Sequence, residues 1–252
     1  MLARTIPFVI TALLATASFG PALGQEGMDR VLHFRYADTV EGLQEIATVI
    51  KAMTEVSESM MDLPQRELKL RGTPAQLAFA EWLLAELDKP AGRPSGPDSS
   101  QHEYRLPGAG DEALRIFYVS HTATPEDLQE VATMVRSMGD IRRLFTCNAT
   151  SAITLRGTPD QIALAEWLVN ALDSQSQAAR EFTMPGNNDD VARVFFLTPE
   201  ESPKRLQEVA AKVRTELGVP RLFIYNGQRA LALRGTPPQI AQADRVIQER
   251  AK

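Results

Sequence analysis

Apolar residues recur three times along the chain with the spacing of an amphipathic helix. Within each copy they fall three or four residues apart, which places them on one helical face that a core can cover. The three apolar stripes are Leu43, Ile46, Ala47, Ile50 and Met53, then Leu128, Val131, Ala132, Val135 and Met138, then Leu206, Val209, Ala210, Val213 and Leu217. Thr39, Thr124 and Ser202 precede these stripes, and their hydroxyls are expected to cap the first turn.

A second helix in each copy has a stronger start signal. Thr73, Thr158 and Thr236 are each followed by proline and, three residues after the threonine, by glutamine. This pattern predicts a capping box with proline at the first helical position. Each following stripe has a central alanine, which favours close packing on a sheet: Leu77, Ala80, Leu84 and Leu87, then Ile162, Ala165, Val169 and Leu172, then Ile240, Ala243 and Ile247.

Runs rich in β-branched and aromatic residues fill the remaining positions and predict strands. Strands before the first helix of each copy are expected at residues 31–36, 115–119 and 193–197. Between the helices, residues 221–225 and 230–233 flank Asn226-Gly227, a strong signal for a tight hairpin turn. Residues 143–147 and 152–155 repeat this hairpin, and extra upstream strands are expected at residues 102–108 and 180–186.

The spacing between two repeated motifs shows that one structural unit has been copied. The Leu-Gln-Glu and Arg-Gly-Thr-Pro motifs begin at Leu43 and Arg71, at Leu128 and Arg156, and at Leu206 and Arg234, the same distance apart each time. We therefore predict an α+β fold of three tandem β-α-β-β-α units. Each unit is expected to be a small three-stranded sheet with two helices packed on it, with an extra N-terminal strand in units two and three.

The predicted units span residues 28–90, 102–174 and 180–252. Residues 91–101 form a linker rich in Pro, Gly and Ser, which is typical of a mobile connection. Each unit is near the lower size limit for independent stability, which favours docking between neighbours. The long linker favours flexible connection instead, and the sequence leaves both arrangements open.

The N-terminal segment has the layout of a secretory signal peptide over residues 1–24. Arg4 precedes an apolar run over residues 6–19, and Ala22 and Gly24 are the small residues before the expected cleavage site. The alternative is an uncleaved anchor, but the run of about 14 residues is shorter than the ~20 needed to span a bilayer. We expect a periplasmic or secreted protein that is not inserted in a membrane after signal removal.

Composition and charge argue against nucleic-acid binding. The chain has 27 Lys and Arg against 32 Asp and Glu, a net charge of −5, so a uniformly basic surface is excluded. KH modules bind RNA through a Gly-x-x-Gly loop, and the string Gly24-Gln25-Glu26-Gly27 lies at the expected cleavage site, outside any unit. No nucleic-acid partner is expected.

Catalytic chemistry has little support in the sequence. The single cysteine, Cys147, excludes an intramolecular disulfide and a cysteine-based zinc site, and a small apolar role is favoured for it over a reactive thiol. His33, His102 and His121 do not recur at one position of the repeat, and no known catalytic motif is present. We expect a non-enzymatic protein with no catalytic residue, no cofactor and no metal.

Repeated arginines and tryptophans are the candidate interface residues. The arginines are either solvated strand ends that discourage edge pairing, or salt-bridge donors toward an adjacent unit or subunit. They are Arg71, Arg156 and Arg234, which end the last strand of each unit, and Arg143 and Arg221, which begin the hairpin. Trp82 and Trp167 share one helix position, where the third copy has Arg245. They are expected at the edge of the core or as anchors between units, which the last copy would not need.

The unit resembles the short N-terminal domains of bacterial secretins, which are ring-building, KH-like modules. The resemblance rests on the β-α-β-β-α order, the Gly-Thr-Pro-x-Gln helix start, and a second helix ending in Leu-Asp at Leu87-Asp88 and Leu172-Asp173. It extends over residues 30–252 and implies periplasmic modules that bind secretion or pilus components and assemble with further copies. The sequence ends at Lys252 without the secretin barrel, which favours an interaction module over a pore.

These observations together predict an exported protein-interaction scaffold that binds protein partners. Homo-oligomer formation is one of the interactions that this hypothesis includes. The alternatives are an envelope hydrolase or ligand-binding protein with a site between repeats, and a cell-wall-binding repeat protein. A cleft that gathers His102, His121 and acidic residues from different copies would favour the hydrolase.

Overall fold

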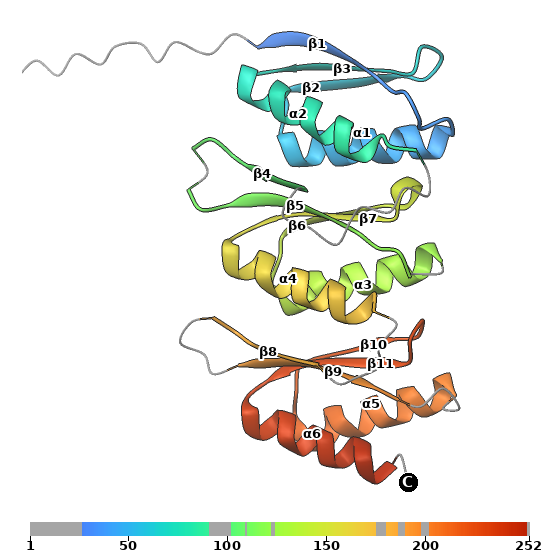
Figure 1. Cartoon of the computed structure of the whole chain (residues 1–252), viewed down its shortest axis with the longest axis vertical. Helices are drawn as coiled ribbons and strands as arrows, with labels where there is room; N and C mark the ends of the chain where they lie inside the picture. Colours follow the sequence, from blue (N-terminus) through green and yellow to red (C-terminus); the bar gives the residue numbers. More distant parts are fainter. Residues whose placement is uncertain are drawn as a thin grey trace, which may run out of the picture.

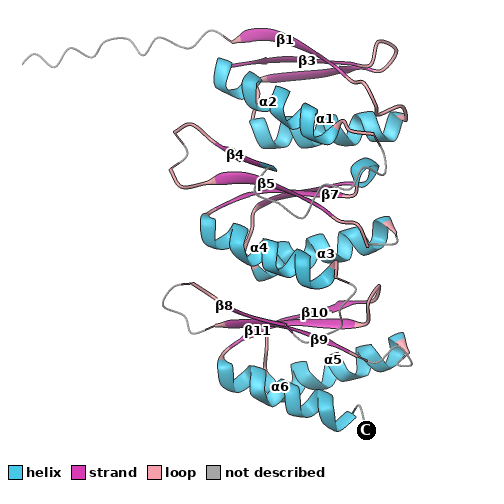
Figure 2. Cartoon of the chain, viewed as in Figure 1, coloured by secondary structure: helices cyan, strands magenta, loops and turns pink. Residues whose placement is uncertain are grey.

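The computed structural model describes residues 27–90, 102–108, 110–121, 124–174, 180–185, 190–197 and 202–250. The predicted signal peptide and the predicted linker lie outside these ranges. The described residues form three α+β units, each with a small antiparallel sheet covered on one side by two helices (Figure 1). Figure 2 shows sheets and helices alternating along the long axis. The predicted fold class is confirmed.

Unit 1 contains three strands and two helices, which are β1 (Met28–His33), α1 (Val40–Thr54), β2 (Glu58–Asp62), β3 (Glu67–Gly72) and α2 (Pro74–Leu87). The strand order is β1-β3-β2, and both pairs are antiparallel. The first strand begins earlier than predicted and ends before Tyr36, because the backbone of residues 35–37 binds a helix end instead of a neighbouring strand.

Units 2 and 3 each add the predicted upstream strand. Unit 2 comprises β4 (Glu103–Arg105), β5 (Ala113–Tyr118), α3 (Pro125–Met138), β6 (Arg143–Cys147), β7 (Ala152–Gly157) and α4 (Pro159–Leu172). Unit 3 comprises β8 (Arg180–Thr183), β9 (Val191–Phe196), α5 (Pro203–Leu217), β10 (Arg221–Tyr225), β11 (Ala230–Gly235) and α6 (Pro237–Arg250). Their sheet orders, β4-β5-β7-β6 and β8-β9-β11-β10, are equivalent. The added strands are shorter than predicted, since Pro107 and Gly108 turn the chain after β4 and Gly108 has a positive φ of 79°.

The capping residues form the predicted contacts. Thr73 Oγ1 accepts a hydrogen bond from the N–H of Gln76 at 3.3 Å, and the Gln76 side chain accepts one from the N–H of Thr73 at 2.9 Å. The amide of each capping glutamine also donates to a backbone carbonyl at the end of the first helix of its unit. These bonds run from Gln76 to Glu55 (2.7 Å), from Gln161 to Gly139 (3.0 Å) and from Gln239 to Leu217 (3.3 Å). The repeated glutamine therefore fastens the two helices of a unit together.

The aspartate that ends the second helix anchors the loop that follows the first strand. The carboxylate of Asp88 accepts hydrogen bonds from the backbone N–H groups of Arg35, Tyr36 and Ala37 at 2.5, 3.0 and 2.7 Å. Asp173 repeats this contact in unit 2. A carboxylate is suited to this position because it accepts several hydrogen bonds at once. The Leu-Asp ending thus has the same structural role in units 1 and 2.

The predicted hairpin of unit 3 is present, but its turn differs from the expected tight turn. Tyr225 pairs with Ala230, so four residues form the loop. Arg229 takes the left-handed conformation, with φ of 50°, as Arg66 and Ser151 do at the same position of the other units. Gly227 is needed for space: a Cβ there would lie 2.7 Å from an Asp127 carboxylate oxygen.

The three units dock on one another. The apolar core between the helices of unit 1 and its own sheet continues into the sheet of unit 2, and the core of unit 2 continues into the sheet of unit 3. Docking, which the sequence left open, therefore makes one continuous stack. No helix among the described residues is long and apolar enough to cross a membrane.

Candidate functional site

Each sheet of units 2 and 3 is buried on both faces. The helices of the same unit cover one face, and the helices of the preceding unit pack against the other. The contacts across units are between α1 and β6 and between α3 and β10. We call the contact between units 1 and 2 seam 1, and the contact between units 2 and 3 seam 2. Because the strands are covered on both faces, they read as continuous apolar runs.

Seam 1 is apolar at its centre. The sheet of unit 2 contributes fully buried Leu114, Ile116, Cys147 and Ala152 to the same cluster as Val49, Phe79 and Leu83 on the helices of unit 1. Burial raises the pKa of the Cys147 thiol to about 11, so the side chain stays neutral and acts as a small apolar group.

Seam 2 repeats this arrangement at the same positions of the unit. The sheet of unit 3 contributes buried Ala192, Val194, Tyr225, Ala230 and Ala232, which pack in one cluster with Met134, Leu164 and Leu168 on the helices of unit 2. Burial raises the pKa of the Tyr225 phenol above its ordinary value. The two seams are therefore two copies of one interface.

A polar clamp fixes one side of each seam. Glu45 on α1 accepts hydrogen bonds from the backbone N–H of Asn148 at 2.8 Å and from its side-chain amide at 2.7 Å. Glu130 on α3 accepts the same two bonds from Asn226 at the same distances. Glu45 and Glu130 are the third residues of the repeated Leu-Gln-Glu motif. In these two copies the motif therefore supplies a contact between units.

Arginine-carboxylate pairs fix the other side of each seam. In seam 1, Arg143 pairs with Glu55, which follows the last turn of α1. In seam 2, Arg221 binds Asp140 at 2.8 Å, and Arg234 lies 3.6 Å from the same carboxylate. Arg156 lies 3.9 Å from Glu55. Four of the five predicted arginines, all except Arg71, thus lie against the preceding unit.

The tryptophans also lie at the seams. The Trp82 ring on α2 lies 5.3 Å from the Tyr104 ring on β4, and Phe79 stacks on the same tyrosine at 4.7 Å. The Trp167 ring on α4 lies 5.5 Å from the Phe182 ring on β8. Each tryptophan therefore contacts the added strand of the following unit.

The sheet of unit 1 has a free outer face, because no unit precedes it among the described residues. Its positions match the apolar seam positions of units 2 and 3, but only Val31 and Met60 are apolar, next to His33. The other four are charged: Asp29, Asp62, Glu67 and Lys69. Arg71 on this face has no preceding helix to bind, lies 3.9 Å from Asp29 and is half exposed.

The helices of unit 3 also have an outer face that no described unit covers. The seam residues Met134, Leu164, Trp167 and Ala171 of unit 2 are replaced at the equivalent positions by Lys212, Gln242, Arg245 and Glu249. Gly218 also stands where Glu55 and Asp140 bind arginines in the seams. Both ends of the stack are therefore polar versions of the faces that dock within it.

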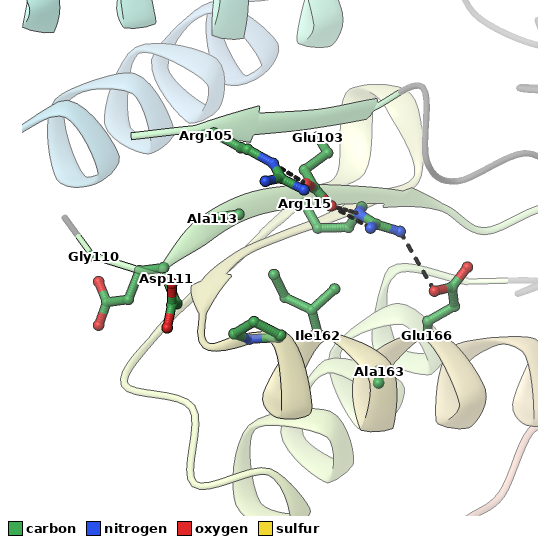
Figure 3. Close-up of a pocket in the computed structure, with 11 residues that line it drawn as sticks. Glu103, Arg105, Gly110, Asp111, Ala113, Arg115, Ile162, Ala163 and Glu166 are labelled. Carbon is green, nitrogen blue, oxygen red and sulfur yellow. Dashed lines mark hydrogen bonds and ion pairs between the residues drawn. The ribbon is translucent and has the colours of Figure 1, made fainter. Parts of the chain in front are cut away.

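A pocket with a volume of about 290 Å³ lies beside β4 and α4 (Figure 3). Three of its charged residues are paired: Arg115 binds Glu103 and lies 3.4 Å from Glu166. The hydrogen bond from Arg115 keeps the pKa of Glu103 below its ordinary value. Unit 3 repeats the triad with Arg193, Glu181 and Asp244, which indicates a device that fastens the second helix to the sheet.

The histidines lie in separate surroundings. His102 Nδ1 lies 2.8 Å from Glu86, whose carboxylate also accepts a hydrogen bond from Lys89 at 2.7 Å. Burial opposes the charge on Glu86, but these two partners outweigh it and lower its pKa. His121 lies 3.7 Å from Asp173 and is partly exposed. In the part of the chain that the structure describes, no group of three or more His, Cys, Asp or Glu side chains is placed to hold a metal ion.

Several interface residues were missed by sequence reasoning, above all Glu45, Glu130, Asn148 and Asn226. The partners in each clamp are about a hundred residues apart, so no local pattern joins them. One sequence signal could have indicated the docking face. Val49 and Met134 lie off the core stripe and are apolar, whereas the equivalent residue of the third copy, Lys212, is charged.

No protein-family model and no curated protein matches the chain. Among solved structures, the N-terminal domain of the secretin XcpQ from Pseudomonas aeruginosa is 13% identical, with a TM-score of 0.27; the match covers 90% of this chain and 100% of that one. ExeD from Aeromonas hydrophila is 16% identical over 90% of this chain and 42% of that one, with a TM-score of 0.22. The a/eIF2alpha-aDim2p-rRNA complex from Pyrococcus horikoshii OT3 contains a chain 14% identical over 60% of this one and 87% of its own length, with a TM-score of 0.33. At these identities and TM-scores the likenesses assign no function.

Proposed function

We propose that the protein is a non-enzymatic, exported scaffold that binds protein partners of the cell envelope, in association with a secretion or pilus system. The observation that carries this proposal is the pair of equivalent apolar seams, which join three units into one stack with polar ends. Such a stack offers a long surface whose parts hold fixed positions. Repeat proteins use surfaces of this kind to bind other proteins.

Among the described residues, the charged groups at the pocket and beside two histidines bind one another. Arg115, Glu103 and Glu166 fasten a helix to a sheet, and Glu86 binds Lys89 and His102. His102 and His121 have separate carboxylate partners, Glu86 and Asp173. These arrangements support a scaffold over a hydrolase with a site between repeats.

Export is supported by the leader-like sequence of residues 1–24. An exported scaffold would act in the periplasm or outside the cell and would find its partners among envelope proteins. The polar end faces also restrict self-assembly. A homo-oligomer would use sheet edges or side surfaces of the stack, because the end faces carry fewer apolar residues than the seams; Val31 and Met60 are the exposed apolar residues of the unit 1 face.

Site-specific photo-crosslinking in the native envelope tests this function. A photoreactive residue is placed at Met60 or Arg245 on the free faces, at Tyr36 on the side of the stack, or at Leu83 in seam 1, and the full chain is exported normally. We expect crosslinks to other envelope proteins from exposed positions and crosslinks within the chain from position 83. A protein of monomeric mass that forms no intermolecular crosslink from any exposed position would contradict the proposal.

A further inference from the structure

Among the described residues, the first strand of unit 1 has no neighbour that corresponds to the added strands of units 2 and 3. In unit 2, β4 pairs with β5, and in unit 3, β8 pairs with β9, both antiparallel. The equivalent strand β1 pairs with β3 alone among the described strands, so its outer edge carries unpaired backbone N–H and C=O groups. Edges of this kind pair with extended segments.

The side chains along this edge show what the neighbour would contribute. Arg115 and Arg193 each bind one carboxylate from the second helix and one from the added strand, Glu103 or Glu181. Arg30 holds the same position on β1 and binds the helix carboxylate of Glu81 at 3.1 Å. The carboxylate from an added strand is missing there in the described part of the chain.

The side chains on β1 are more exposed than their counterparts in units 2 and 3, which an added strand covers. The side chain of Arg30 is 49% exposed, whereas those of Arg115 and Arg193 are 10% and 23% exposed. Met28 is 50% exposed, whereas its counterparts Ala113 and Val191 are both 7% exposed. Ala113 and Val191 lie opposite residues of the added strands, so the same cover over β1 would bury Met28.

We propose that the outer edge of β1 binds an extended segment of another protein, antiparallel to β1, with a glutamate or aspartate facing Arg30. This inference rests on the proposed function and specifies the chemistry of one partner. The segment would add a fourth strand to the sheet of unit 1, as β4 and β8 do within the chain. Backbone pairing supplies affinity, and the carboxylate sets the register because it must lie opposite Arg30.

Two nearer sources of a strand do not supply this carboxylate. Residues 1–25 contain no Asp or Glu. The β1 strand of a second copy, paired antiparallel in one continuous sheet, places residues of the same face opposite each other. Arg30 shares its face with Met28 and Leu32, so a second β1 would bring another arginine or an apolar side chain to it. A foreign segment with an acidic residue fits better than either.

A peptide with the sequence of residues 178–185, which contains β8, is the probe. It is titrated into the purified full-length exported chain while backbone amides are followed by nuclear magnetic resonance. We expect the amide signals of Met28–His33 to shift and their hydrogen exchange to slow. Replacing the peptide glutamate with glutamine should weaken binding about three- to tenfold, because a charge-assisted contact is lost.

Matched variants separate the proposed contact from general charge effects. Arg30→Gln should weaken binding as much as the altered peptide does, whereas Arg71→Gln, whose side chain is equally exposed on the outer sheet face, should leave it unchanged. Arg30→Glu combined with a lysine in place of the peptide glutamate should restore binding. Failure of the β1 signals to respond, or shifts confined to β9, would overturn the proposal. So would β1 protection that depends on protein concentration or is already present in the free chain.

The envelope crosslinking experiment distinguishes this inference from the proposed function. If Arg30→Gln removes crosslinks from a photoreactive residue at Met28, both stand. If the variant crosslinks as the unmodified chain does, the strand-binding site is wrong while the scaffold remains supported. If the unmodified chain captures no protein at all, the proposed function is wrong.

Discussion

Glu45 and Asn148 join units 1 and 2 through two hydrogen bonds to one carboxylate, at 2.8 and 2.7 Å. Glu130 and Asn226 repeat this contact between units 2 and 3. Glu208 is the equivalent residue of unit 3, and no described unit follows that unit. Its carboxylate lies 3.6 Å from Arg205 on the same helix. One position of the repeat is therefore a clamp in two copies and a surface residue in the last.

Removing a clamp carboxylate should destabilise the stack. In Glu45→Ala or Glu130→Ala, the amide and backbone donors of the facing asparagine lose a charged acceptor, so we expect the free energy of unfolding to fall by about 1 to 2 kcal/mol. Urea unfolding of the full chain measures the change.

Glu208→Ala is the matched control, because it removes the same residue type at the same repeat position without breaking a seam. Its effect should stay within about 0.5 kcal/mol, as is usual for surface substitutions. Equal losses in all three variants would mean that the carboxylate acts through its own helix and that the clamp contributes nothing.

The outer helix face of unit 3 should mediate self-association of the chain if its polar residues are replaced by the equivalent residues of unit 2. The fourfold variant Lys212→Met, Gln242→Leu, Arg245→Trp and Glu249→Ala recreates the apolar face that unit 2 buries in seam 2. We expect it to self-associate, since an exposed apolar patch of this size marks an interaction surface. Light scattering after size-exclusion chromatography reports the mass.

Ala241→Leu with Gln248→Leu controls for added hydrophobicity. The equivalent residues of unit 2, Ala163 and Asn170, stay exposed although that unit is docked, so these positions lie off the seam. This control should keep the mass of the unmodified chain. If it associates as strongly as the fourfold variant, the polar end face has no specific role.

Cys147 should report on the opening of seam 1. Its pKa of about 11, raised mainly by burial, leaves about one thiol in a thousand ionised at pH 8, and the side chain is fully buried. We expect a thiol reagent to modify the folded chain more than tenfold more slowly than the urea-unfolded chain. Glu45→Ala should speed the reaction, because it loosens seam 1 and removes a negative charge that helps raise the pKa of the thiol, while Glu130→Ala in seam 2 should not. Equal rates for folded and unfolded protein would contradict the buried placement.

Local signals explain why so much of the fold is predictable from the sequence. A helix stripe or a capping box involves residues within a few positions, and Thr73 with Gln76 forms the predicted contacts. The docking of units depends on pairs such as Glu45 and Asn148, whose proximity exists only after two units fold. The replacement of Trp167 in copy two by Arg245 in copy three was a sequence signal of docking. The same repeat position is apolar where it lies in an interface between units and charged where no described unit covers it.

The turn of unit 3 shows a different limit. The Asn-Gly pair predicts a tight turn from local preference, but both residues are fixed by unit 2: Asn226 binds Glu130, and Gly227 leaves room for Asp127. Tertiary contact therefore determines the use of these residues. The left-handed Arg229 that completes the loop gave no sequence signal of its own.

Acid should weaken the ion pair between Glu103 on β4 and Arg115 on β5. Its hydrogen bond from Arg115 lowers its pKa in the folded chain below the ordinary value near 4.3. A carboxylate with a lowered folded pKa stabilises the protein above its unfolded pKa, and this contribution is lost as the pH falls through the folded pKa. Glu103→Gln should therefore be less stable than the unmodified chain at pH 7, and the difference should shrink as the pH falls from about 5 to 3. Urea unfolding of both proteins across this range measures it, and a difference that stays constant would show that the ion pair with Arg115 contributes no pH-dependent stability.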